Sequence, residues 1–252
     1  MLKGIDISRW QGITDFNKLK LSQQFIIIRS SYGNGYTDQQ FNRNRDECRR
    51  LQIPRGFYHY SYPQYNSAQA EADWFLKVVG TPQAGEWLVL DFEERYAGNT
   101  VQWCYDFLNY IKDNLNGYKA VIYLNLSQTK SYNWKPIIDD GYGLWLAYYN
   151  QNPNAPVPIT PWAVVAMRQW SSIQHYDGIA GAVDANVFYG TLTAFPKYGY
   201  QPPPPPPLPP PPVLNCTDYE RISKETKNVI DSGDNDQTKV SKIREITANV
   251  KP

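Results

Sequence analysis

A run of prolines constrains this chain more than any other feature of its sequence. Residues 201–213 read QPPPPPPLPPPPV and hold half of the 20 prolines in the 252-residue chain. Proline fixes φ near about −65° and has no backbone N–H, so the run cannot join a sheet or a helix. We expect an extended polyproline II rod, roughly 35–40 Å long at ~3.1 Å per residue. Polyproline can also dock into aromatic grooves, but a place between two segments that can fold favours a spacer.

The proline run divides the chain into a body, residues 1–200, a linker, residues 201–213, and a tail, residues 214–252. A body of this length can bury one core and has the usual size of an α/β barrel. The 25 basic and 24 acidic residues give a formal net charge of +1. No strong field therefore favours nucleic acid or an anionic membrane as a partner.

Cysteine and histidine are too few and too scattered to predict a metal site. Cys48, Cys104 and Cys216 form no recognisable disulfide or metal spacing, and His59 and His175 are the only histidines. We therefore expect no metal or organic cofactor. The N-terminal residues lack a secretory signal pattern, and no apolar run approaches the ~20 residues that span a bilayer. We expect a product made in the cytoplasm, which needs a release route if its substrate lies outside the membrane.

Short apolar runs bounded by turn residues recur through the body, which is typical of strands buried on both faces of a parallel sheet. They are residues 2–7, 25–31, 55–61, 87–91, 119–124, 144–148, 164–169 and 181–187. Amphipathic segments that suit helices lie between the early runs, at residues 38–51, 67–79 and 100–115. After Leu144 the intervals are polar and broken by proline. The pattern predicts an α/β fold, a TIM-like (β/α)5(β)3 barrel with about five helices.

Acidic residues close three of the predicted strands, at the end of a barrel where chemistry takes place. They are Asp6, Asp91 with Glu93, and Asp184. Carboxyl groups that are buried close together have raised pKa values, and a glycosidase needs a carboxyl group that keeps its proton at neutral pH. Alternatively, these acids form salt bridges to arginines such as Arg29 or Arg168, or bind a divalent ion.

The spacing of Asp91 and Glu93 places them together. Residues i and i+2 of a strand point to the same face, ~6–7 Å apart along it. We expect Asp91 and Glu93 at the mouth of the barrel, with Phe92 and Glu94 facing the other way.

Aromatic and polar residues near the ends of other strands are candidate substrate contacts, because an aromatic face combines apolar surface with a polar edge and stacks on sugar rings. The candidates are Tyr58, His59, Tyr60, Tyr123, Tyr148, Gln169 and Trp170. A lone histidine such as His59 is more often a hydrogen-bonded core residue than a catalyst.

Seven motifs in order resemble glycoside hydrolase family 25, the muramidases common among phage endolysins and bacterial autolysins. GIDISRWQG is similar to the family's D-x-S-x-(W/H)-(Q/N)-G, and LVLDFEE to its D-x-E signature. FIIIRSSYGNGYTDQQFNRN, GFYHYSYP, LWLAYY, MRQW and VDANVF resemble its other strands. The resemblance covers residues 1–200. Many members have Glu in the motif R-x-(T/S)-E-G where this chain has Tyr32, which bears on substrate detail.

The resemblance implies hydrolysis of the β-1,4 bond between N-acetylmuramic acid and N-acetylglucosamine in peptidoglycan. It assigns Glu93 as the general acid, while Asp91 would orient the substrate's N-acetyl group or stabilise oxocarbenium charge. Asp6 and Asp184 would line the same cleft. The nucleophile of the second step, the substrate's acetamide or a protein group, stays open, and the two-residue spacing favours the acetamide.

The resemblance further implies a phage endolysin that reaches the wall through a holin or as part of a virion. The alternative is a non-catalytic glycan-binding or structural virion protein that keeps the barrel. A chitinase is the nearest enzymatic rival, but its D-x-x-D-x-D-x-E run is absent, since residues 87–90 read WLVL.

The tail has equal numbers of acidic and basic residues and one aromatic residue, Tyr219. Apolar residues recur at helical spacing in two stretches, around Val229 and around Ile243, with DSGDND between them. We predict two short amphipathic helices. Self-association or docking of a partner, binding to the wall, and disorder all remain open for this segment.

Overall fold

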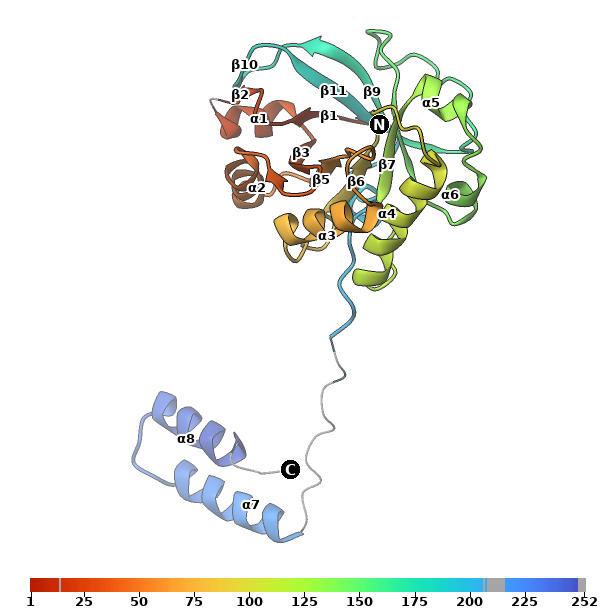
Figure 1. The fold of residues 1–252 in the computed structure, drawn as a ribbon. Coiled ribbons are helices and arrows are strands. Elements are labelled where there is room, and N and C mark those ends of the chain that lie inside the picture. Colours follow the sequence, from red (N-terminus) through yellow and green to blue (C-terminus); the bar gives the residue numbers. More distant parts are fainter. Residues whose placement is uncertain (14, 206, 208–215, 249–252) are drawn as a thin grey trace. The chain divides into compact units, whose positions relative to one another are not determined.

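The computed structural model describes residues 1–13, 15–205, 207 and 216–248 (Figure 1). The chain divides into two compact units, Met1–Pro203 and Pro204–Pro252. The predicted polyproline rod lies largely outside the described residues, and residues 201–205 and 207 belong to neither helix nor strand. Within the described ranges, no helix is long and apolar enough to cross a membrane.

Eight strands of the first unit close into a barrel, as the alternating pattern predicts (Figure 1). Their order around the barrel is β1-β11-β9-β8-β7-β6-β5-β3, and β3 pairs again with β1. Neighbours pair in parallel except at β11, which runs antiparallel to both β1 and β9. The strands are β1 Leu2–Ile7, β3 Phe25–Tyr32, β5 Arg55–Tyr60, β6 Trp87–Asp91, β7 Val121–Asn125, β8 Leu144–Ala147, β9 Val165–Gln174 and β11 Val183–Phe188.

Six α-helices, rather than about five, occur in the described part of this unit. They are α1 Phe16–Ser22, α2 Phe41–Arg50, α3 Ala68–Val79, α4 Thr100–Asn114, α5 Leu126–Ser131 and α6 Lys135–Asp139. Side chains cap several of their N-termini: Ser67 accepts from the backbone N–H of Ala70 before α3, and Asn99 from that of Gln102 before α4. Helix α2 begins at Phe41 rather than near Asp38, the buried carboxylate of an ion pair with Arg29.

Three short strands were not expected from the sequence. β4, Tyr36–Thr37, pairs with β3, and β2, Gly12–Ile13, pairs with β10, Ile179–Ala180. β9 also extends five residues past the predicted end at Gln169, to Gln174. Together with β11 it forms a hairpin that rises above the barrel beside β10 (Figure 1).

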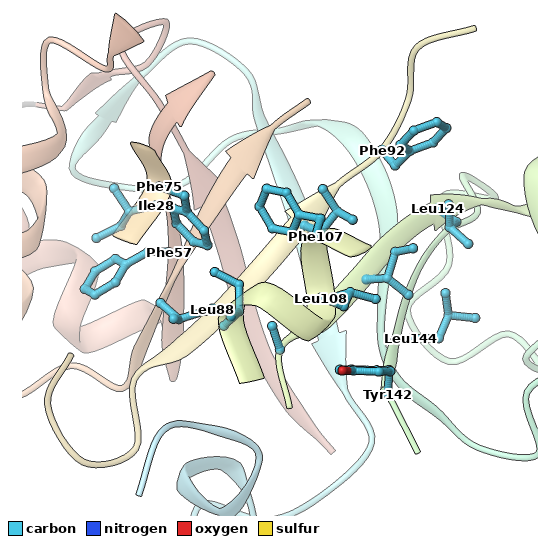
Figure 2. Close-up of a cluster of buried hydrophobic side chains, with 14 of the residues drawn as sticks. Ile28, Phe57, Phe75, Leu88, Phe92, Phe107, Leu108, Leu124, Tyr142 and Leu144 are labelled. Carbon is cyan, nitrogen blue, oxygen red and sulfur yellow. The ribbon is translucent and has the colours of Figure 1, made fainter. Parts of the chain in front are cut away.

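Side chains of the strands alternate between two apolar layers. Leu88 and Leu90 of β6 face outward and join a cluster with Phe107 of α4. Figure 2 shows Leu88 and Phe107 of this cluster. Trp87 and Val89 face inward and join the cluster inside the barrel. Because side chains of a strand alternate with period two, Asp91 continues this inner row.

Aromatic rings fill the N-terminal end of the barrel. Trp87 stacks on Phe195 of the short helix η1, Phe195–Tyr198, with ring centroids 4.7 Å apart, and its Nε1 donates to the carbonyl oxygen of Phe195 at 2.8 Å. Phe188 packs edge-on against both rings. The barrel interior is therefore filled by side chains at this end.

The second unit contains two helices, α7 Cys216–Ile230 and α8 Asp236–Ala248. Polar contacts join them: Lys242 pairs with Asp234 at 2.6 Å, and Lys239 Nζ donates to the carbonyl oxygen of Ile230 at 2.7 Å. Where side chains of residues 216–248 are described, none is buried, and Ile230 and Val240 are about half exposed.

Candidate active site

Four acidic side chains meet at the C-terminal end of the barrel. Asp6, Asp91, Glu93 and Asp184 line one cavity of about 180 Å³, which we call the acidic cavity. Asp6 of β1 lies directly opposite Asp184 of β11 in the antiparallel pair. Asp91 ends β6, and Glu93 follows two residues later. The strand-end positions expected from the sequence therefore bring all four acids together.

Asp6 is buried and held by two side-chain amides. Its Oδ2 accepts from Nε2 of Gln169 and from Nδ2 of Asn186, each at 2.7 Å. Burial and the charge of Asp184 raise the pKa of Asp6 well above its ordinary value, and the two amide hydrogen bonds lower it in part.

The two amides are themselves fixed by aromatic side chains. Oε1 of Gln169 accepts from the hydroxyl groups of Tyr123 at 2.7 Å and Tyr149 at 2.6 Å. Oδ1 of Asn186 accepts from Nε1 of Trp145 at 2.9 Å. Both amides must therefore turn their N–H groups toward Asp6, which sets the position of this carboxyl group.

Asp91 is buried with an unpartnered oxygen. Its side-chain Oδ1 has no hydrogen-bond partner among the described residues. Its backbone oxygen is held by Ser61, from Oγ at 2.9 Å and from N at 3.0 Å. Burial, the charge of Glu93 and the charge of Asp6 raise the pKa of Asp91 well above its ordinary value, and Arg29 opposes this rise. A buried acceptor without a donor is costly unless a ligand supplies one.

Glu93 reaches solvent, unlike Asp91. Partial loss of water around its carboxyl group and the charge of Asp184 raise its pKa, while its interaction with Asp91 lowers it in part. The charge of Glu93 in turn raises the pKa of Asp91. Burial also raises the pKa of Asp184 to about 6.

The salt bridges considered as an alternative do not involve these acids. Arg29 lines the acidic cavity, but its NH2 pairs with Oδ2 of Asp38 at 2.8 Å. Arg168 is fully buried and donates to the carbonyl oxygens of Ala155, Asn152 and Pro153. Neither arginine forms an ion pair with the cluster. Burial and the neighbouring carboxylates therefore set the pKa values of these acids.

The predicted substrate contacts divide into two groups. Tyr58, Tyr60, Tyr123 and Gln169 line the acidic cavity. His59, Tyr148 and Trp170 do not line it. His59 is fully buried, so it cannot contact a substrate directly, whereas substrate contacts by Tyr148 and Trp170 stay predictions.

The alternation of side chains along the strands explains why these three residues do not line the cavity. His59 lies between the inward-facing Tyr58 and Tyr60, so it faces the helices. Tyr148 follows the last residue of β8 and packs against the outer core. Trp170 follows Gln169 and packs with Ala185 and Val187 instead.

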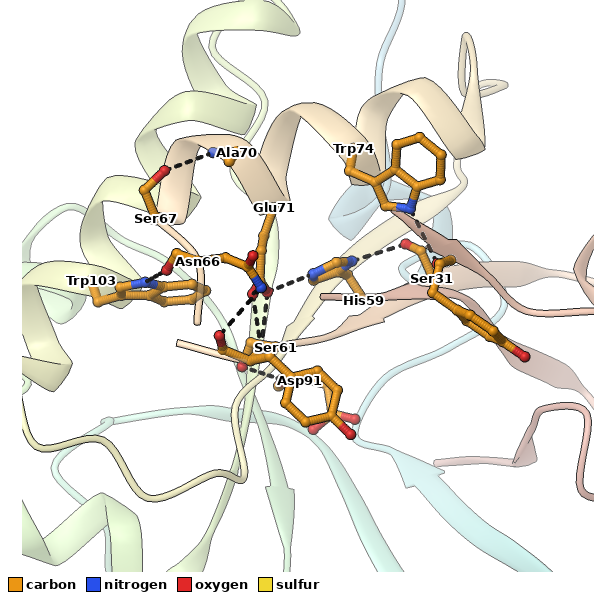
Figure 3. A network of polar contacts seen from close by, with 12 residues as sticks. Ser31, His59, Ser61, Asn66, Ser67, Ala70, Glu71, Trp74, Asp91 and Trp103 are labelled. Carbon is orange, nitrogen blue, oxygen red and sulfur yellow. Dashed lines mark hydrogen bonds and ion pairs between the residues drawn. The ribbon is translucent and has the colours of Figure 1, made fainter. Parts of the chain in front are cut away.

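His59 belongs to a buried polar network behind the cavity (Figure 3). Its Nε2 lies 2.9 Å from Oε2 of Glu71, and its Nδ1 lies 2.9 Å from Oγ of Ser31. Glu71 also accepts from Nδ2 of Asn66 and from the backbone N–H of Tyr62. Burial lowers the pKa of His59. Ser31, His59 and Glu71 are fully buried, so a substrate cannot reach them, and the network holds the loop that follows β5.

Several cavity residues were not singled out as contacts from the sequence. They are Ser8, Trp10, Gln11, Arg29, Trp145 and Tyr149, together with Asn186, which binds Asp6. The sequence indicates Asn186, because it lies two residues after Asp184 on the same strand and therefore points to the same face. Glu94 also differs from expectation, because its Oε1 accepts from the hydroxyl of the cavity residue Tyr60 at 2.8 Å. In the part of the chain that the structure describes, no group of three or more His, Cys, Asp or Glu could hold a metal ion.

Comparisons with known proteins agree with this geometry. The sequence model described as "Glycosyl hydrolases family 25" matches residues 5–179. Lysozyme M1 of Streptomyces globisporus is 28% identical over 213 residues, which cover 75% of this chain and 68% of that protein. The uncharacterized protein YegX of Escherichia coli strain K12 is 31% identical over 202 residues, covering 76% and 71%. The crystal structure of a lysozyme from Streptomyces coelicolor superposes with a TM-score of 0.68 at 25% identity, covering 79% of this chain and 96% of that one.

Proposed function

The chain belongs to glycosyl hydrolase family 25, and on that premise we propose that the acidic cavity cleaves the β-1,4 bond that follows N-acetylmuramic acid in peptidoglycan. Membership makes the chain a glycoside hydrolase of the lysozyme type. The roles of the individual carboxyl groups, the bond and the biological setting belong to the proposal.

Glu93 is the general acid in this proposal. It lies at the solvent side of the cluster, where a glycosidic oxygen can approach, and its pKa is raised. The proton of Glu93 passes to the leaving oxygen as the bond from the sugar's C1 to that oxygen breaks. The resulting carboxylate then takes a proton from the water that adds to C1.

Asp91 positions the nucleophile. Its unpartnered Oδ1 can accept the N–H of the sugar's N-acetyl group, which turns the acetamide oxygen toward C1. The acetamide oxygen forms the new bond to C1 while the leaving oxygen departs, and water later displaces it. Asp6 and Asp184 support this step, because their charges raise the pKa values of Asp91 and Glu93.

One observation carries the proposal: four carboxyl groups, all with raised pKa values, converge in one cavity and neither neighbouring arginine pairs with them. Structural carboxylates are normally paired or ligated when they are buried, whereas perturbed groups gather at functional sites.

The test is digestion of purified cell walls, followed by mass spectrometry of the released fragments. The proposal predicts fragments with muramic acid at the reducing end, and a loss of about 10²- to 10⁴-fold in rate for Glu93→Gln. Equal clearing by wild type and Glu93→Gln would rule out the role of Glu93. If neither cleared the walls, the alternative of a non-catalytic glycan-binding or structural virion protein would be favoured.

We also propose that the enzyme is a phage endolysin that reaches the wall after release, through a holin or with a virion. The family resemblance supports this setting. Expression in a bacterium with a susceptible wall should leave the cells intact until the membrane is permeabilised. Lysis before permeabilisation would contradict release by a second factor.

The second unit is proposed to bind another copy of itself. Its helices leave Tyr219, Ile230 and Val240 at least half exposed, and apolar surface of this kind favours association. Removing residues 201–252 should reduce the mass measured in solution from that of an oligomer to that of a monomer. A full chain that is already monomeric would contradict the proposal.

A further inference from the structure

A row of aromatic side chains borders the acidic cavity on the side of β1, β3 and β5. We call it the aromatic rim, and its members are Trp10, Tyr32, Tyr36, Tyr60, Tyr62 and Tyr65. Trp10 and Tyr60 also line the cavity. The rim therefore begins in the site itself and leads away from it.

Consecutive rings of the rim are in contact. Tyr62 lies at its centre, with ring centroids 5.5 Å from Tyr60, 5.7 Å from Tyr32 and 6.3 Å from Tyr65. Tyr32 lies 3.9 Å from Tyr36. These separations are at or below those of ordinary aromatic pairs, so the rings form one continuous surface.

Arg9 connects Trp10 to the rest of the rim. Its guanidinium lies 4.4 Å from the centroid of the Trp10 ring and 5.5 Å from that of Tyr36. NH1 of Arg9 also donates to the hydroxyl oxygen of Tyr36 at 2.5 Å. A cation held over two rings fixes both of them, which reduces the entropy lost when a ligand binds.

The loops that carry the rim are rigid at their base. The backbone N–H of Tyr62 donates to Glu71 of the buried network in Figure 3 at 3.0 Å. Gly33 has φ +51° and donates to the carbonyl oxygen of Tyr60 at 3.0 Å. A Cβ at Gly33 would lie 3.2 Å from Cδ2 of Tyr62, so glycine allows the ring to lie close against this turn.

The two ends of the rim are open to solvent. Trp10 is 70% exposed and Tyr65 is 79% exposed. A cluster that served only to pack its own loops would bury its outermost rings. Large exposed aromatic surface next to a cavity indicates a binding site instead.

We propose that the aromatic rim binds sugar rings of the glycan strand that lie beyond those held in the acidic cavity. This inference rests on the proposed function, because a polymeric substrate must leave the cavity over its border. Tyrosine and tryptophan offer apolar faces for the sugar ring and polar edges for its hydroxyl groups. The charged peptide stems of peptidoglycan would need free ionic partners. Three charged side chains contact rim rings among the described residues, and each already has a partner: Arg9 lies over Trp10 and Tyr36, Arg29 pairs with Asp38, and Glu94 accepts from Tyr60.

Tyr32 completes the row. Its ring joins Tyr36 to Tyr62. A carboxylate here would put a charge between the two rings and separate them. Tyr32 therefore makes this side of the cleft a continuous stacking surface.

The experiment measures binding without turnover. Glu93→Gln is titrated by calorimetry with peptide-free oligosaccharides of alternating N-acetylglucosamine and N-acetylmuramic acid, four and eight sugars long. We expect the longer ligand to bind more tightly. Adding Tyr65→Ala or Tyr62→Ala should weaken the eight-sugar ligand about tenfold, which is about 1.4 kcal/mol, and leave the four-sugar ligand unchanged.

Tyr219→Ala is the matched control, since Tyr219 is 63% exposed in the other unit. Tyr65→Ala cannot fail by misfolding because its side chain is in solvent, and the midpoint of thermal unfolding checks Tyr62→Ala. Equal effects on both ligand lengths, or no effect on either, would overturn the proposal. Weakening seen only with peptide-bearing fragments would overturn it in favour of the peptide stem. Failure of the proposed function is distinct: wild type would cleave neither oligosaccharide, while the length dependence of binding to Glu93→Gln would persist.

Discussion

A buried acid lies at each end of strand β6, and the pKa values of the two acids shift in opposite directions. Glu86, next to the closed end of the barrel, is 1% exposed and accepts from Arg49 at 2.8 Å and from Arg55 at 2.7 Å. These partners outweigh the effect of burial and lower the pKa of Glu86. Asp91, at the open end, is 6% exposed, has an unpartnered oxygen and has a raised pKa.

The contrast separates stability from function. Burial disfavours both charges, and Glu86 stays ionised because Arg49, Arg55 and the backbone N–H of Gln83 donate hydrogen bonds to it. At the closed end Arg49 and Arg55 donate to Glu86, and these ion pairs connect α2 and β5 to the start of β6. At the open end no arginine pairs with Asp91 or Glu93 among the described residues, so these carboxyl groups can hold and transfer a proton.

Asp91→Asn should lower activity about as much as Glu93→Gln. The amide keeps the size of the side chain but can no longer accept the N–H of the N-acetyl group with full charge, so we expect the rate of wall digestion to fall by about 10²- to 10⁴-fold. The thermal midpoint should stay the same or rise, because an unfavourable buried carboxyl group is removed. A large loss of stability with normal activity per folded molecule would show that Asp91 serves stability rather than catalysis.

Glu86→Gln should show the opposite profile. Removing the charge leaves Arg49 and Arg55, which are 23% and 11% exposed at their side chains, without their shared carboxylate. We expect a loss of roughly 3 kcal/mol in the free energy of unfolding, measured with urea. Activity per folded molecule should be unchanged. An unaltered unfolding midpoint would mean that the closed end does not depend on this pair.

Asp184→Asn should give a smaller effect that depends on pH. The folded-state pKa of about 6 lies above the ordinary value of 3.8, so folding favours the protonated carboxyl group. Its contribution to stability is present below the ordinary pKa and is lost as the pH rises through about 6. We therefore expect Asp184→Asn to be more stable than wild type by about 1 kcal/mol at pH 8, after allowance for solvent screening, and equally stable near pH 4. Unfolding curves at the two pH values check this, and an equal difference at both would contradict the shift.

Much of the fold could be predicted because its strands are continuous apolar runs. The run that ends at Asp91 marks both the strand and its inward face, and the acid two residues later follows the same rule. Asn186 could have been found by applying that rule after Asp184. The same alternation shows why Tyr58, His59 and Tyr60 cannot all face the cavity.

Other features depend on contacts that sequence spacing does not reveal. The partners of Glu86 lie 37 and 31 residues away, on a different helix and strand. The pairing of Arg29 with Asp38, rather than with the acids beside it, follows from the turn after β3. Tyr149 lines the cavity and Tyr148 does not, because the alternation of β8 continues past Ala147: Trp145 and Ala147 lie in the inner cluster, and Tyr148 packs against the outer one.

A carboxyl carbon-13 NMR titration of the folded enzyme, with resonances assigned through Glu86→Gln and Asp91→Asn, measures the difference between the two ends of β6. Glu86 should release its proton below the ordinary glutamate value of about 4.3, whereas Asp91 and Glu93 should both release theirs above their ordinary values. If Asp91 and Glu93 both titrated at the ordinary values of about 4, the open end would behave like an exposed surface, and the proposed role of its carboxyl groups would be wrong.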